Sequence, residues 1–154
     1  SYMPDQADRL SYYTLLFSLK NINEIDEIRE EITDRFGKIP PIIDRLINTA
    51  ILRFYASYAM FERIVITAQK ISLILPKGEK EEYYQTSFTK ILKHIMEKYQ
   101  RDVNFIQNKD VMKLEMKNTF KNPETVLSAV TAFCKEISEL FEADSGMSQQ
   151  NLLN

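Results

Sequence analysis

Two side chains in this sequence could do acid–base or nucleophilic chemistry at neutral pH. His94 is the single histidine, with an ordinary pKa near neutrality, and Cys134 is the single thiol. No serine or cysteine near His94 in the sequence suggests a nucleophile that it could activate. We therefore interpret His94 as a surface or boundary residue of a helix and Cys134 as a partly buried structural thiol. The sequence predicts no catalytic residue.

The composition also argues against a metal or cofactor site. One Cys and one His supply too few ligands for a Cys/His zinc site. The whole chain has 3 glycines, which leaves little from which to build a phosphate-binding loop. The segment Pro76-Lys77-Gly78 lacks both the second glycine and the Lys-Ser/Thr pair of such a loop. We expect neither a metal nor a cofactor.

Four acidic residues on one side of a predicted helix are harder to explain as an ordinary solvent-exposed face than any other feature of the sequence. At about 100° per residue they fall within roughly 100° of arc, opposite the apolar side of a predicted helix. Arg29 and Arg35 lie away from the centre of this row and can screen it only partly. One of them lies in the last turn, where the helix dipole disfavours an anion by about 0.3–1 kcal/mol. A solvent-exposed face and a face reserved for a basic partner both fit this acidic stripe, which consists of Glu27, Glu30, Glu31 and Asp34.

The aromatic and lysine residues suggest a different function, the binding of nucleic acid. The chain has 8 Tyr and 9 Phe, which could stack on bases. Most of them recur at helical core spacings, so core packing explains them better. Lys109, Lys113, Lys117 and Lys121 would supply phosphate contacts. A nucleic-acid-binding accessory domain is therefore the alternative, and salt-dependent DNA binding would distinguish it.

Three helices are predicted in the first part of the chain. The first is capped by Asp5 or Asp8 and carries apolar residues as far as Phe17. The second runs from an N-cap at Asn23 to Gly37, with Ile25, Ile28, Ile32 and Phe36 on its apolar side. The third extends from Pro40-Pro41 to about Phe61 and is apolar on most of its circumference, so we expect it to be buried at the centre of the domain.

The second part of the chain changes period and predicts strands. Short β-branched runs at 63–67 and 71–75 are followed by a helix over 84–99. Two more strands, 103–107 and 111–116, flank a turn at 108–110 and should pair antiparallel. A last helix begins at Asn122-Pro123 and continues to about Phe141. The fold class is α+β: three N-terminal helices, a small, mostly antiparallel sheet of about four strands, and two further helices.

Length and charge set the class of protein. The 154 residues, of which 44% are hydrophobic and 27% charged, suit one globular domain. We expect a single domain over residues 1–143 and a disordered tail over 144–154, cut from a longer polypeptide. A net charge of −2 argues against a dedicated nucleic-acid binder, and one cysteine fits a reducing, cytoplasmic compartment. No apolar stretch is long and uninterrupted enough to span a membrane.

The run EITDRFGKIP at residues 31–40 resembles a family signature, E-x-x-D-R-F-G-x-x-P. That signature belongs to the C-terminal (TRCF) domain of bacterial transcription-repair coupling factors, also called Mfd. Tyr2-Met3-Pro4, Arg9-Leu10 and Tyr13 are similar to the opening segment of the same domain. The resemblance covers residues 2 to about 61.

The resemblance implies a regulatory domain without catalysis in a large ATP-driven DNA translocase. Such a protein removes stalled RNA polymerase and recruits excision repair. Its C-terminal domain packs on a UvrB-like module of the same protein and masks the surface that UvrA would bind. Acidic residues of the signature helix face arginines on that module, and Glu31 and Asp34 match them. Glu27 and Glu30 extend the stripe by our own assignment. No direct nucleic-acid or membrane partner is expected.

Overall fold

The computed structural model describes residue 16 and residues 18–153, with side chains as far as residue 142. The chain divides into two compact units, Ser1–Phe54 and Tyr55–Asn154. The single domain over residues 1–143 stays a prediction. The predicted first helix lies outside the described residues except for Leu16, which is helical and 1% exposed.

The first unit is organised around helix α2 (Glu24–Phe36) and the start of helix α3 (Pro41–Tyr58). The predicted apolar side of α2 is confirmed, because Ile25, Ile28 and Ile32 are all buried. Asn23 precedes α2 as expected, but its side chain makes no capping hydrogen bond. The fully buried core of this unit consists of Leu16, Ile25, Ile28, Ile32, Ile43, Ile47 and Ala50.

The turn between α2 and α3 depends on one glycine. Gly37 has φ 79° and ψ −138°, and its amide donates to the carbonyl of Thr33. Only glycine adopts this backbone region without strain, so the predicted role of Gly37 as helix stop is confirmed. Helix α3 then begins as the Pro40 carbonyl accepts hydrogen bonds from the amides of Ile43 and Asp44.

Helix α3 is buried along one side rather than all round. It ends at Tyr58, before the predicted limit near Phe61, and Met60 follows with φ 67°. Ile42 and Tyr58 are about half exposed. An apolar circumference therefore did not require full burial, because apolar atoms make up much of any protein surface.

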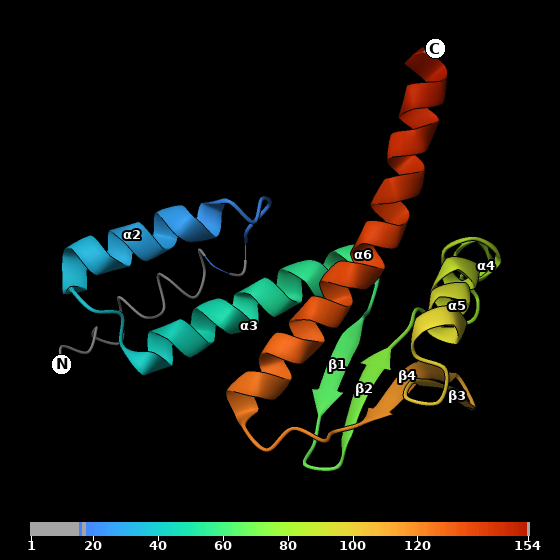
Figure 1. Ribbon diagram of the computed structural model, residues 1–154, viewed down its shortest axis with the longest axis horizontal. Coiled ribbons are helices and arrows are strands. Elements are labelled where there is room, and N and C mark those ends of the chain that lie inside the picture. Colours follow the sequence, from blue (N-terminus) through green and yellow to red (C-terminus); the bar gives the residue numbers. More distant parts are fainter. Residues whose placement is uncertain (1–15, 17, 154) are drawn as a thin grey trace. The chain divides into compact units, whose positions relative to one another are not determined.

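The second unit contains a four-stranded antiparallel sheet, as predicted, with strand order β1-β2-β4-β3 (Figure 1). Its ladders join each strand to its neighbour in antiparallel register. The β3–β4 hairpin turns through Lys109, whose φ of 52° suits a tight hairpin turn. The strands are β1 (Arg63–Ile66), β2 (Lys70–Ile74), β3 (Asn104–Asn108) and β4 (Val111–Lys117).

Three helices belong to this unit where two were predicted. The predicted helix 84–99 is divided into α4 (Glu81–Gln85) and α5 (Ser87–Lys98) at Thr86, whose φ of −119° departs from helical geometry. Helix α6 (Pro123–Leu153) includes residues 144–153, for which the sequence predicted a disordered tail. Once nucleated, a helix propagates at little cost, and no proline follows Pro123 to stop it.

One face of the sheet is apolar and packs against helices. The side chains of Ile71, Leu73 and Leu114 on this face are at most 1% exposed. Phe88 of α5 lies against Phe105 of β3, with ring centroids 5.0 Å apart. The buried positions two residues apart in β2, with Leu114 opposite Leu73 in β4, thus show which side of the sheet meets the core.

Candidate interaction surface on helix α2

All four residues of the acidic stripe are exposed on α2, as the sequence predicted. Among the residues that the structure describes, none of the four forms an ion pair. Glu27 and Asp34 are seven residues apart, so the stripe extends about 10 Å along the helix. Within the part of the chain that the structure describes, the stripe is therefore a row of carboxylates without ion-pair partners.

The arginines of α2 do not neutralise the stripe. Arg29 reaches across to α3, where Nη1 donates to Asp44 Oδ1 at 2.9 Å and Nη2 to Asn48 Oδ1 at 3.3 Å. Arg35 lies over the ring of Phe36, 5.4 Å from its centroid. Arg29 thus ties α2 to α3, and this contact between distant residues could not be read from the sequence.

The helix dipole separates the four acids into two groups. Glu27 belongs to the first turn of α2, where a negative charge is stabilised by the helix N-terminus. Glu30 and Glu31 lie in the middle of the helix, and Asp34 lies near its carboxyl end, where the dipole disfavours it. Glu27 therefore has a structural explanation within its own helix, whereas Glu30, Glu31 and Asp34 have none.

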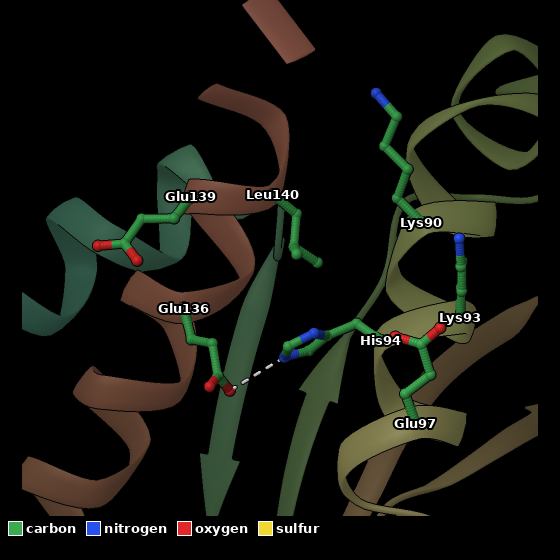
Figure 2. Close-up of a pocket in the computed structure, with 7 residues that line it drawn as sticks. All are labelled: Lys90, Lys93, His94, Glu97, Glu136, Glu139 and Leu140. Carbon is green, nitrogen blue, oxygen red and sulfur yellow. Dashed lines mark ion pairs between the residues drawn. The ribbon is translucent and has the colours of Figure 1, made fainter. Parts of the chain in front are cut away.

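A second cluster of charged residues lines an open groove of about 460 Å³ between α5 and α6 (Figure 2). Glu136 of α6 lies at its base and accepts hydrogen bonds from Lys98 and from the hydroxyl of Tyr99. His94 Nε2 lies 3.3 Å from Glu136 Oε2, within ion-pair distance but without hydrogen-bond alignment. The groove residues are Lys90, Lys93, His94, Glu97, Glu136, Glu139 and Leu140.

The surroundings of Glu136 set its charge. Desolvation by itself would raise its pKa, but the hydrogen bonds from Lys98 and Tyr99, together with the proximity of His94, outweigh that effect and lower the pKa. Burial raises the pKa of Tyr99, and its hydrogen bond to Glu136 raises it further. Glu136 is therefore an ionised clamp that joins α5 to α6. The half-buried position of His94 agrees with its interpretation as a boundary residue.

Cys134 is a structural residue of the α6 core. Its side chain is fully buried, and burial raises the pKa of the thiol to about 12. The thiolate, which is the nucleophilic form, is therefore negligible at neutral pH. Within the described part of the chain, no group of three or more His, Cys, Asp or Glu could hold a metal ion. No described helix is long and apolar enough to cross a membrane.

The fold places only some of the lysines that were predicted to contact nucleic acid close to one another. Lys113 and Lys117 lie on the same face of β4, because they are separated by an even number of residues. Lys109 lies in the β3–β4 turn, and Lys121 lies beyond the end of β4. The sequence analysis missed Lys70, which pairs directly opposite Lys117 in the ladder between β2 and β4. Only the strand order reveals that neighbour.

Comparison with protein families gives a match for the first part of the chain. The model described as TRCF domain matches residues 1–86, which include α2, α3 and the first two strands. The acidic stripe lies within the matched region.

A curated protein and a solved structure are both similar to this chain. The transcription-repair-coupling factor of Escherichia coli (strain K12) is 42% identical over 52 residues, which are 34% of this chain and 4% of that protein. The crystal structure of a C-terminal domain of transcription-repair coupling factor superposes with a TM-score of 0.70, covering 93% of this chain and 89% of the other at 20% identity. The chain thus spans a small part of the curated relative, and the structural match shows that the fold is shared.

Proposed function

The chain belongs to the TRCF domain family, and on that basis we propose that it is a regulatory protein-interaction domain without catalytic activity of its own. Its partner is the UvrB-like module of the DNA translocase of which it forms the C-terminal part, in the bacterial cytoplasm. Bound there, it masks the surface that UvrA would recognise and holds the translocase in a repressed state. The observation that carries this proposal is the acidic stripe of α2, which forms no ion pair with any residue that the structure describes.

Glu31 and Asp34 are the centre of the proposed contact. They lie three residues apart on one helix face, which places their Cβ atoms about 5–6 Å from each other. A partner with two arginines at matching spacing would pair with both carboxylates, and Arg–carboxylate pairs are strong and directional. Glu27 and Glu30 lie toward the helix N-terminus and would contribute mainly long-range attraction.

The energetics favour a mask that is closed at rest and can be released. A flexible tether supplies an effective concentration on the order of 1 mM. An intrinsic Kd near 10 μM would then keep about 99% of the molecules closed, a bias of about 2.7 kcal/mol. Truncating one partner of a buried charge pair costs about 2–5 kcal/mol. The free energy lost with Glu31 and Asp34 together therefore exceeds the roughly 2.7 kcal/mol that favours the closed state. The double substitution should release the domain from the UvrB-like module.

Calorimetric titration of the UvrB-like module with this chain tests the proposal. We expect binding in the micromolar range and no measurable heat for the double variant Glu31→Ala/Asp34→Ala. The matched control is Glu139→Ala/Glu142→Ala, which removes two exposed acids with the same spacing from α6. The control variant should bind like the original chain, and far-UV circular dichroism should show that all three proteins keep their helices.

The competition with UvrA needs its own measurement. UvrA added to the preformed complex should displace this chain from the UvrB-like module. Binding of the double variant with unchanged affinity would refute the role of the acidic stripe. Simultaneous binding of UvrA and this chain would refute the masking mechanism but leave the contact itself intact.

A further inference from the structure

One face of the sheet carries positive charge, although the whole chain is negative. Residues directly opposite each other in a ladder point to the same side of a sheet, so the register defines two faces. One is the apolar face that meets the core. The other, here called the cationic sheet face, has four cationic side chains and one carboxylate, a net charge of +3. Its residues are Arg63, Val65, Lys70, Ser72, Ile74, Asn104, Ile106, Asn108, Val111, Lys113, Glu115 and Lys117.

The cationic sheet face is accessible. The side chain of Lys70 is 62% exposed, and Val111 is 47% exposed at the other end of β4. Arg63 and Lys117 are exposed as well. Lys113 and Glu115 are more covered, as expected for residues of an inner strand flanked on both sides.

The single carboxylate does not neutralise this face. Glu115 lies 3.4 Å from Lys70 and 3.3 Å from Lys113. In the described part of the chain, Lys117 and Arg63 form no ion pair. Lys117 also lies directly opposite Lys70 across the ladder, a like-charge arrangement that destabilises a sheet. An unfavourable pair kept on an exposed face indicates that an anion binds there.

We propose that the cationic sheet face binds the phosphate backbone of duplex DNA without sequence preference. Lys113 and Lys117 are four residues apart on one strand, about 14 Å, and over that length B-DNA carries about eight phosphate charges. Asn104, Asn108 and Ser72 add neutral groups that hydrogen-bond phosphate oxygens. This assignment goes beyond the proposed masking function and uses a different surface.

Two other occupants fit the face less well. Single strands are held largely by stacking of bases on aromatic rings, and none of the twelve residues of this face is aromatic. An acidic protein segment would need cations at a spacing that matches its own carboxylates, but apolar Val65, Ile74 and Ile106 lie between the cations of this face. The regular, dense charge of a duplex needs only flexible lysines within reach.

The net charge of −2 had argued against nucleic acid, but it is an average over the whole chain. The acids are concentrated on α2, whereas the cationic sheet face lies on a different element. Phosphate contacts depend on the charge of the face that makes them, which is +3 here. A negative chain can therefore bind DNA through one face.

Fluorescence anisotropy of a labelled 20-base-pair duplex with the full 154-residue chain tests the proposal. Three to four phosphate contacts predict a slope of log K against log salt near −3, a 40- to 150-fold loss of affinity between 50 and 200 mM salt. Arg63→Ala and Lys117→Ala should each reduce the slope by about 1. Lys38→Ala, which removes the same charge from the α2–α3 turn, should leave it unchanged.

Several results would overturn the assignment. These are no binding at 25 mM salt, binding that Arg63→Ala and Lys117→Ala leave unchanged, and a single strand that binds more tightly than the duplex. Tighter binding of a polyglutamate peptide of equal charge would assign the face to an acidic protein segment instead. Glu31→Ala/Asp34→Ala should bind the duplex normally, so failure of the masking proposal and failure of this one are distinguishable.

Discussion

Replacing Gly37 by alanine tests the backbone geometry on which the acidic helix depends. Gly37 ends α2 with φ 79° and ψ −138°, close to a region that only glycine populates freely. A Cβ built on this residue would have nothing within 4 Å. The substitution therefore changes backbone strain alone, because no side chain or backbone atom has to move.

The expected loss of stability follows from two opposing effects. Holding alanine in this conformation costs about 1–3 kcal/mol. Alanine also lowers the conformational entropy of the unfolded chain, which stabilises the folded state by about 0.4–1 kcal/mol. The net loss in the free energy of unfolding lies between about 0 and 2.6 kcal/mol. Its midpoint, about 1.3 kcal/mol, corresponds to a fall in Tm of roughly 3–5 °C for a chain of this length. Urea titration followed by far-UV circular dichroism measures the net loss.

Gly78→Ala is the matched control. The φ of Gly78 is outside the left-handed region, and its added Cβ would meet Met112 Cε at 3.0 Å. That methyl group is the end of a flexible side chain and can move aside. We expect the stability of Gly78→Ala to stay within about 0.5 kcal/mol of the original. If Gly37→Ala is as stable as Gly78→Ala, the strain argument is wrong and another residue sets the end of α2.

Two further predictions concern the second unit. Cys134, with its pKa raised to about 12 by burial, should resist iodoacetamide at pH 8 in the folded protein and react in urea; rapid alkylation without denaturant would contradict its burial. Glu136→Gln should lower the free energy of unfolding by about 1 kcal/mol near neutral pH, because the charge-assisted bond from Tyr99 becomes a neutral one. The pKa of Glu136 is lowered from 4.5 on folding, so the stability that its carboxylate contributes is fully present above pH 4.5 and is lost as the pH falls through the folded pKa. The free energies of unfolding of the original chain and of Glu136→Gln should therefore converge in acid. A difference between them that stays constant with pH would refute this pH dependence.

Features governed by neighbouring residues were predictable from the sequence. The apolar stripe of Ile25, Ile28 and Ile32 and the acidic stripe opposite it follow from the helical period alone. Gly37 and the β3–β4 turn were predicted because their conformations restrict the residue types that fit. The division of one predicted helix at Thr86 was missed, because no glycine or proline marks it.

Strand order was beyond the reach of the sequence. Alternation within β4 places Lys113 and Lys117 on one face, but it does not say which strand lies beside them. The order β1-β2-β4-β3 brings Lys70 opposite Lys117, from 47 positions earlier in the chain. Glu136 likewise meets Tyr99 only through the packing of α6 on α5.

The sequence by itself therefore determined most of the helices and strands and the acidic face of α2, because those depend on residues within a few positions of each other. Tertiary structure alone decided which charges are neutralised. Arg29 is held by Asp44, which leaves the acidic stripe without that partner, and Glu115 pairs with Lys70 and Lys113 but not with Lys117. Ion pairs form between groups within a few ångströms, and that proximity is set by packing between elements, which local periodicity does not contain.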